Sequence, residues 1–132
     1  MQNLTRKRST TSVLLMINVA KRKGISREQC LNGTGITDEM LVDNRIEINP
    51  EQELKLIENL VDEQVNQSLN ETLAVDIGGQ YHLTTYGIFS FAISTSPSIR
   101  SAIEIGVGYL PLSFAFCTIF LREEENYAYL VL

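Results

Sequence analysis

The spacing of apolar residues changes once along this chain, at Pro111, and that change constrains the fold more than any other feature. Before Pro111, apolar side chains mostly recur three and four residues apart, the period of an α-helix. After it they alternate, as in β-strands, on either side of the polar stretch Arg122–Asn126. The pattern predicts a mainly α fold of the α+β class: a bundle of about five helices followed by a β-hairpin that begins a larger sheet. The two predicted strands are Phe114–Leu121 and Tyr127–Leu132.

Capping residues, prolines and glycines predict the ends of the helices. Asn49-Pro50 places a capping amide before a proline at the first helical position, which predicts a helix from Pro50 to about Gln67. Ser96-Pro97 repeats that signal for a helix that Pro111 ends. Other helices are predicted from Thr10–Ser12 to about Lys23, from Asn70 to Gly78-Gly79, and from Thr84 or Thr85 through Ile93. Shorter pieces are expected at Ser26–Leu31 and Thr37–Leu41 (helical) and at Arg45–Ile48 (extended).

Apolar residues at helical spacing also predict which helix faces point inward. Asn59 is expected on the solvent side of the helix that begins at Pro50, and Ala102 with Gly106 would let a neighbouring helix approach closely. The expected inward residues are Val13, Met16, Ile17 and Ala20; then Leu54, Ile57, Val61 and Val65, widened by Leu56 and Leu60; then Leu73, Ala74 and Ile77.

Length and charge limit the possible functions. The 132 residues suit one compact domain. Residues 1–27 carry seven basic and no acidic side chains, whereas residues 28–132 carry four basic against 16 acidic ones, a net charge of −12. An acidic body of this kind repels nucleic-acid phosphates, so this chain is not expected to bind DNA by itself.

The segment Ser26–Leu41 has the outline of a helix-turn-helix, with two short helical pieces around a glycine turn. Its second piece contains Asp38 and Glu39 and no Arg or Lys, so DNA would repel it. We therefore predict that this segment packs in the core.

Nothing in the sequence predicts an enzyme, a metal site or a cofactor. His82 is the only histidine, and Cys30 and Cys117 make neither a disulfide framework nor a zinc site. A nucleophilic pair of Cys30 with His82 would need a proximity that no local signature supports. The carboxylates of Glu123, Glu124 and Glu125 are expected at a solvated hairpin tip.

Membrane insertion is not expected. The uncharged run Ile105–Leu121 has 17 residues, fewer than the roughly 20 that a span needs, and it contains Gly106, Gly108 and Pro111. A buried helix end followed by a buried strand explains it more simply. With no cleavable leader in the basic amino-terminal segment, the expected location is the cytoplasm.

Aromatic residues concentrate between residues 86 and 116 and suggest an apolar pocket with a few hydroxyl groups, suited to a small molecule. Aromatic side chains at such spacing more often belong to a plain core, and this alternative stays open. The candidate ligand-binding residues are Tyr86, Phe89, Tyr109, Phe114 and Phe116.

The last predicted strand, Tyr127–Leu132, is apolar on both faces, which predicts cover on both sides. A lone hairpin is marginally stable in water. We therefore expect the 132 residues to be a fragment that ends inside or just after a sheet.

The stretch Tyr86–Ile103 is similar to a known family of regulators. Gly87 opens an apolar helix, a serine-rich turn follows at Ser94–Ser98, and Ile99–Ile103 forms the second helix, with Ser101 where glutamate is common. This stretch resembles one in the amino-terminal domains of a subgroup of AraC-type transcription regulators. The resemblance extends to segments at Gly24–Leu31, Asp43–Ile48, the helix from Pro50 and the hairpin from Phe114.

The resemblance implies a single amino-terminal regulatory domain over residues 1–132, truncated here, that binds an effector or dimerises in a bacterial regulator. DNA would be bound only through a helix-turn-helix domain beyond residue 132. The expected partners are a small-molecule effector, whose identity does not carry over, and a second copy of the chain. The alternative is a helical interaction module without a small-molecule ligand.

Overall fold

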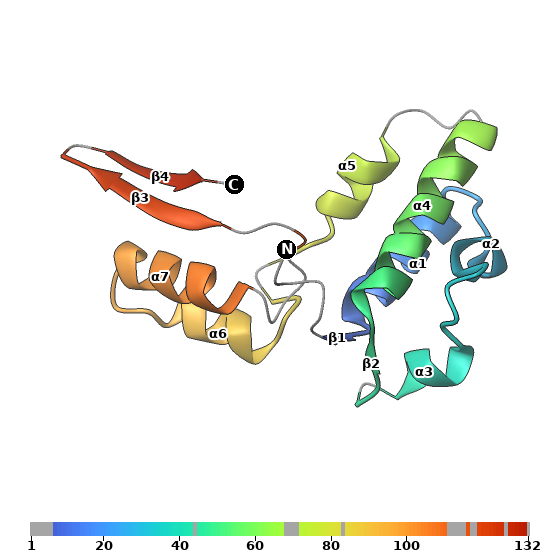
Figure 1. Cartoon of the computed structure of the whole chain (residues 1–132), viewed down its shortest axis with the longest axis horizontal. Coiled ribbons are helices and arrows are strands. Elements are labelled where there is room, and N and C mark those ends of the chain that lie inside the picture. The colour runs from blue at the N-terminus through green and yellow to red at the C-terminus, as the bar shows by residue number, and fades with distance from the viewer. Residues whose placement is uncertain are drawn as a thin grey trace. The chain divides into compact units, whose positions relative to one another are not determined.

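The chain forms a mainly helical structure, represented by a computed structural model that describes residues 7–43, 45–67, 72–82, 84–110, 116, 119–125 and 127–131 (Figure 1). The predicted mainly α, α+β class is confirmed. About five helices were predicted, and the described residues contain seven. The difference is the two short pieces predicted around residues 26–41, which are helices as well. In chain order the elements are β1 (Arg8–Ser9), α1 (Thr11–Arg22), α2 (Arg27–Leu31), α3 (Asp38–Val42), β2 (Glu47–Ile48), α4 (Pro50–Asn66), α5 (Leu73–Gly78), α6 (Ile88–Ser94), α7 (Ile99–Tyr109), β3 (Phe120–Glu124) and β4 (Tyr127–Val131).

The chain divides into two compact units. The helical unit, Lys7–His82, contains α1 to α5 with β1 and β2. The hairpin unit contains α6, α7, β3 and β4, which follow His82. The buried apolar residues that the structure describes all belong to the helical unit.

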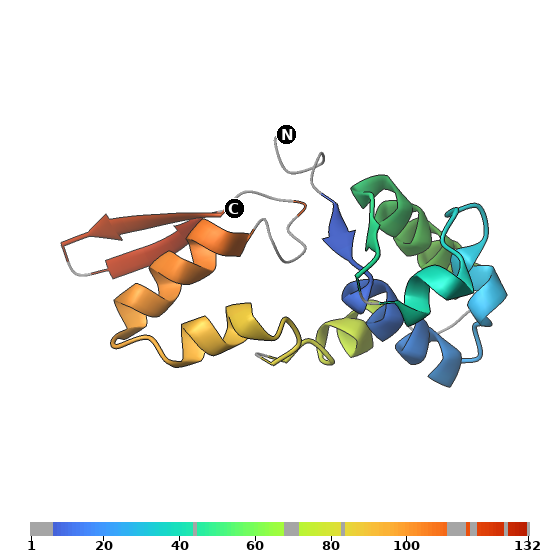
Figure 2. The same cartoon turned by 90° about the horizontal axis from the view of Figure 1, so that it is seen from below.

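Helices α1 and α4 form the centre of the helical unit. Helix α2 packs against both, α5 packs against α1, and β1 pairs antiparallel with β2, with Arg8 opposite Ile48 (Figures 1 and 2). Full burial of a side chain such as Leu56 stabilises a fold by roughly 1.5–3 kcal/mol. The core consists of Val13, Met16, Ile17, Val19, Ala20, Ile25, Cys30, Ile36, Leu41, Ile48, Leu56, Leu60 and Leu73.

Capping contacts start several helices where the sequence predicts. The Ser26 hydroxyl accepts a hydrogen bond from the Gln29 backbone N–H (3.1 Å), and the Gln29 side chain accepts one from the Ser26 N–H (2.8 Å). At α4 the Gln52 side chain accepts a hydrogen bond from the Asn49 N–H (3.0 Å), and Pro50 is the first helical residue. Cys30, Ile36 and Leu41 are buried, so the segment with the helix-turn-helix outline does pack in the core.

The predicted inward face of α4 is wrong in detail. Val61 and Val65 are 56% and 73% exposed, whereas Glu53 and Asn59 are buried beside Leu56 and Leu60. The reason is that both polar side chains have partners on other elements. Glu53 pairs with Arg8, and the Asn59 amide donates hydrogen bonds to the carbonyl oxygens of Cys30 (3.0 Å) and Asn32 (2.7 Å).

Helix α5 is shorter than predicted. It begins at Leu73, and the predicted cap Asn70 lies outside the described residues. Leu73 is buried and Ile77 packs against the core, but Ala74 is exposed, contrary to the prediction. Gly79 follows the last helical residue, Gly78, as predicted.

Helices α6 and α7 begin later than predicted. Gly87 precedes α6 with a backbone φ of +57°, a conformation that side-chain-bearing residues rarely adopt, so the helix starts at Ile88 and not near Thr84. At α7 the cap is Ser98, whose hydroxyl accepts a hydrogen bond from the Ser101 N–H (3.1 Å). Gly106 faces the Ile93 side chain of α6, but a Cβ there would lie 3.8 Å from it, an ordinary van der Waals distance, so this contact does not require glycine.

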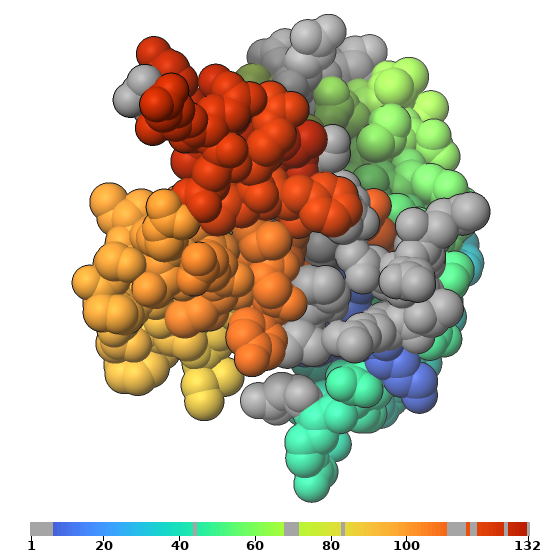
Figure 3. All heavy atoms as spheres, turned by 60° about the vertical axis from the view of Figure 1, so that its left-hand side comes forward, coloured from blue at the N-terminus to red at the C-terminus, as the bar shows by residue number. Residues whose placement is uncertain are grey.

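The hairpin of β3 and β4 lies along α7 in the hairpin unit (Figures 1 and 2), and Figure 3 shows its red atoms against the orange atoms of that helix. The predicted loop Arg122–Asn126 is too long, because β3 runs through Glu124 and pairs Glu124 with Tyr127. Charged residues fit this strand because its side chains face solvent or a partner. The Arg122 guanidinium lies 5.3 Å from the centre of the Tyr129 ring, and Glu123 accepts a hydrogen bond from Arg100 (2.6 Å).

The uncharged run Ile105–Leu121 includes the end of α7 and the first residues of β3, while residues 111–115 and 117–118 lie outside the described part. Among the described residues, no helix has both the length and the apolar character needed to cross a membrane.

Candidate functional site

Helix α1 has a second partly apolar face besides the one that enters the core. Val13, Met16 and Ile17 are buried on the core side. Leu14 and Leu15 are half-buried: they pack against the edge of the core and also line a groove on another side of the helix. Leu14, Asn18 and Arg22 are spaced four residues apart, so they follow one another along this second face.

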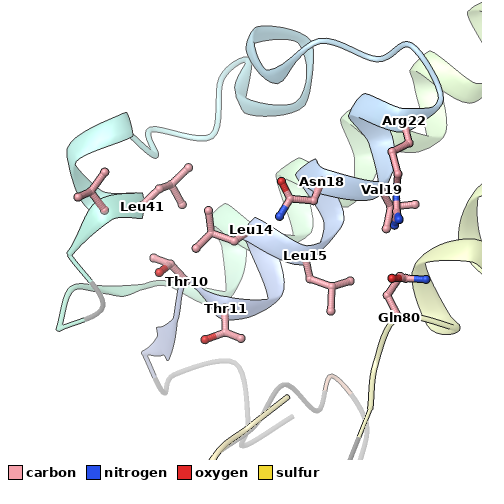
Figure 4. Close-up of a pocket in the computed structure, with 10 residues that line it drawn as sticks. Thr10, Thr11, Leu14, Leu15, Asn18, Val19, Arg22, Leu41 and Gln80 are labelled. Carbon is pink, nitrogen blue, oxygen red and sulfur yellow. The ribbon is translucent and has the colours of Figure 1, made fainter. Parts of the chain in front are cut away.

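This second face forms one wall of an open groove, the α1/α3 groove, with a volume of about 760 Å³ (Figure 4). Leu41 and Val42 of α3 border it at one end, and Gln80, which follows α5, borders it at the other. Its lining residues are Thr10, Thr11, Leu14, Leu15, Asn18, Val19, Arg22, Leu41, Val42 and Gln80.

Apolar and polar side chains both line the groove along its length, and its charged side chain, Arg22, lies toward one end. Figure 4 shows Leu14 near Leu41, whereas Arg22 and Gln80 lie toward the opposite end of α1. Arg22 and Gln80 also border a smaller neighbouring hollow together with Lys23 and Asp76. A ligand in the groove would therefore meet leucine and valine side chains together with the hydroxyls of Thr10 and Thr11, and a guanidinium and two amides toward the Arg22 end.

Among the described residues that line the groove, Arg22 is the one with a charged side chain. Its guanidinium makes no salt bridge to any other described residue. The nearby carboxylate of Asp76 is bound by Lys23 at 2.5 Å. The hydrogen bond from Lys23 is the main reason that the pKa of Asp76 lies below its ordinary value, and the charge of Arg22 adds a smaller effect. Arg22 thus keeps its five N–H donors for another partner.

The hairpin unit contains a second hollow, which is apolar and has a volume of about 220 Å³. It lies among α6, α7 and the hairpin. Its lining residues are Phe89, Ile93, Ile103, Gly106, Val107, Leu110, Ile119 and Leu130.

The five aromatic residues predicted to bind a ligand are not gathered around one described hollow. Phe89 lines the apolar hollow of the hairpin unit. Tyr86 is half-buried before α6, whereas Tyr109 on α7 and Phe116 are exposed. Phe114 lies outside the described residues. Their role in ligand binding remains a prediction.

Comparison with known proteins gives the family. The model of the amino-terminal arabinose-binding domain of AraC transcription regulators matches residues 24–132. The chain belongs to this family. The resemblance that the sequence predicts is thereby confirmed.

Two relatives of this AraC-type domain are uncharacterized helix-turn-helix-type transcriptional regulators of Mycobacterium bovis and Mycobacterium tuberculosis. Each is 24% identical over 112 residues, which cover 85% of this chain and 32% of the relative. The chain thus spans about a third of the length of these relatives. No solved structure matches it significantly.

The family match begins at Gly24, after the end of α1. In this AraC-type domain, α3 and Gln80 lie within the match, whereas the α1 wall of the groove precedes it. The groove was not predicted from the sequence, although the sequence contains a signal for it. Leu14 and Leu15 are apolar residues left over from the inward stripe of α1, and Asn18 and Arg22 follow them at helical spacing.

The described residues contain no group of three or more His, Cys, Asp or Glu side chains that could hold a metal ion. Cys30 is a buried free thiol, and Cys117 lies outside the described residues. Burial raises the pKa of the Cys30 thiol, which lowers its reactivity at neutral pH. The family is one of transcription-regulator domains.

Proposed function

We propose that this chain is the ligand-sensing and dimerisation domain of a transcription regulator and that it controls a helix-turn-helix domain elsewhere in the same protein. The observation that carries the proposal is the family match over residues 24–132. The length of the relatives supports it further. They are named as helix-turn-helix regulators, and this chain covers 32% of each, which leaves ample length for a DNA-binding domain. The two compact units would act together as one regulatory domain in the cytoplasm.

The control would work as a shift between populations. An effector that binds one arrangement of the domain more tightly than another favours that arrangement by the difference in binding free energy. The DNA-binding domains would then be presented to their sites differently. The α1/α3 groove and the apolar hollow of the hairpin unit that Phe89 lines are the two candidate effector sites.

The hairpin unit supports a role in dimerisation. Strand β4 pairs with β3 on one side and carries apolar residues that are exposed, such as Tyr127 at 68% and Leu130 at 59%. Exposed edge strands with uncharged side chains readily pair with another chain. We propose that the partner is a second copy of this chain.

DNA contact is assigned to the helix-turn-helix domain. The net charge of this chain is −5, and Asp38 and Glu39 are exposed at the start of α3, the second helical piece of the helix-turn-helix outline. Phosphate groups would be repelled at this position.

The second candidate function is a helical interaction module without a small-molecule ligand. The observation that favours it is the exposure of apolar residues in the hairpin unit, where Ile88 is 86% and Ile99 is 81% exposed. Large exposed apolar surfaces often mark protein interfaces.

Thermal unfolding of the 132-residue chain against a metabolite library that includes arabinose and other sugars distinguishes the two functions. A sensor gains stability with one class of compound in a concentration-dependent manner, whereas a pure interaction module gains stability only with its own concentration. Sedimentation of the chain and of Tyr127→Lys tests dimerisation, because a charge on β4 should weaken strand pairing between copies. A chain that binds no compound and stays monomeric would contradict the proposal.

A further inference from the structure

We propose that the α1/α3 groove binds a small monocarboxylate with a compact apolar body. This inference rests on the proposed sensor function, because it names the class of effector and the residues that would hold it. It is independent of the family description, since the α1 wall precedes the matched residues 24–132.

The apolar side chains of the groove set the character of the ligand body. Leu14, Leu15 and Leu41 offer methyl groups along the groove, next to the hydroxyls of Thr10 and Thr11, and Val42 is 82% exposed. A ligand with a short alkyl or branched body would remove part of this surface from water, which stabilises the complex. The groove volume of about 760 Å³ lies within the range of small-molecule sites, roughly 300–1,000 Å³.

The Arg22 end of the groove sets the character of the headgroup. The side chains of Asn18 and Gln80 make no hydrogen bond within the described part of the chain, and Arg22 has no salt bridge there. A guanidinium holds a planar carboxylate with two parallel hydrogen bonds, and two neighbouring amide groups can add further donors. The Asp76 carboxylate makes its salt bridge with Lys23, at 2.5 Å, and acts on Arg22 only through the smaller effect of its charge.

The residue types favour a monoanion over other ligands. Phosphate esters carry up to two negative charges, whereas the described lining residues offer a single positive charge, that of Arg22. Sugars present hydroxyl groups on most sides, whereas half of this groove is lined by leucine and valine. A single carboxylate on an apolar body matches the one guanidinium and the leucine and valine side chains of the groove.

The test is titration calorimetry of the 132-residue chain with 3-methylbutanoate and hexanoate, and with their primary amides as neutral analogues of the same shape. We expect the acids to bind at least about tenfold more tightly than the amides, because a guanidinium–carboxylate pair is roughly twice as strong as a neutral hydrogen bond. Arg22→Gln should abolish this preference for the acids. Val42→Ser should weaken both acid and amide, since it removes apolar contact but no charge.

Lys21→Gln is the matched control, because it removes a neighbouring exposed cation of α1 that does not line the groove. It should bind the acids as the parent chain does. Arg22→Lys keeps the charge without the planar fork and should bind with intermediate affinity. Thermal unfolding without ligand verifies that each variant is folded.

The outcomes separate this inference from the proposed function. Equal binding of acid by the parent chain and Arg22→Gln overturns the site. Binding of another library compound, with no binding of the acids, overturns the ligand class and leaves the sensor function standing. If no compound binds and stability depends only on protein concentration, the sensor function itself fails.

Discussion

The Arg8 guanidinium lies 3.4 Å from a carboxylate oxygen of Glu53, and both side chains are almost completely buried. The pair joins β1 to α4 across 45 positions of sequence. The Ser12 hydroxyl forms a further hydrogen bond to Glu53 and lies 2.5 Å from the Tyr81 hydroxyl. Through these neighbours the buried charged pair connects the start of the helical unit to Tyr81, three residues after the end of α5.

Removing one member of this pair should destabilise the chain strongly. Arg8→Met leaves the Glu53 carboxylate buried without a counter-charge, and such a change costs about 3–5 kcal/mol. The double variant Arg8→Met/Glu53→Leu should recover most of that loss, because two apolar side chains can pack together in the same space. Urea unfolding of the four proteins of the cycle measures the coupling. Additive losses in the double variant would show that the two charges do not stabilise each other.

The pair also predicts how stability depends on pH. Burial raises the pKa of the Glu53 carboxyl above its ordinary value of 4.5, and this effect exceeds the opposing effects of the Ser12 hydrogen bond and the Arg8 charge. The folded chain then holds this proton at a pH where the unfolded chain has released it. Stability from this group is fully present below pH 4.5 and is lost as pH rises through the folded pKa.

Glu53→Gln provides the comparison, because it cannot titrate. The free energy of unfolding of the parent, minus that of Glu53→Gln, should fall as pH rises above 4.5 and then become constant. Chemical unfolding across a pH series gives this difference directly. A difference that increases with pH would mean that Arg8 lowers the carboxyl pKa more than burial raises it.

Asn59 should be one of the most sensitive polar residues of α4. Its amide donates hydrogen bonds to two backbone carbonyls, those of Cys30 and Asn32, and Asn59→Ala leaves both without that donor. An unsatisfied buried polar group costs roughly 1–3 kcal/mol, so we expect a loss of that order. Asn66→Ala, at the exposed end of the same helix, is the control and should change stability little. Equal effects of the two substitutions would contradict the assigned role of Asn59.

Two glycines of the hairpin unit should respond to alanine in opposite directions. Gly87 has a φ of +57°, so Gly87→Ala introduces backbone strain of about 1–3 kcal/mol although the space around it is open. Gly108 lies inside α7 with open space around it, so Gly108→Ala should stabilise the helix by up to about 1 kcal/mol. Thermal unfolding of the two variants gives the sign of each change. A stabilised Gly87→Ala would mean that residue 87 has a different backbone conformation.

Local sequence patterns predicted much of this fold. The Asn49-Pro50 start of α4, the Ser26 cap of α2, the stop at Gly79 and the hairpin with Tyr127 opposite β3 depend on residues within a few positions of one another. Helix capping and the alternation of apolar and polar residues in strands act over such short distances, so both can be predicted from the sequence. The family resemblance on Tyr86–Ile103 is of the same kind, because it rests on a contiguous stretch.

The burial of polar groups could not be predicted in this way. Glu53 and Asn59 look like solvent-facing residues of an amphipathic helix, and only their partners Arg8, Cys30 and Asn32 explain why they are buried. The start of α7 shows a milder form of the problem. Ser96-Pro97 and Ser98 are both plausible caps, and the hydroxyl that accepts the Ser101 N–H is that of Ser98.

The sequence by itself determined the class of the fold, the positions of most helices and the family of the chain, because these depend on neighbouring residues. Only the tertiary structure decided that α1 has a groove on its second face, since Arg22, Leu41 and Gln80 come from separate elements. It also decided which face of α4 is buried. The physical reason is that burial of a polar side chain is costly unless a hydrogen-bond or charge partner is present. Here those partners lie far away along the chain.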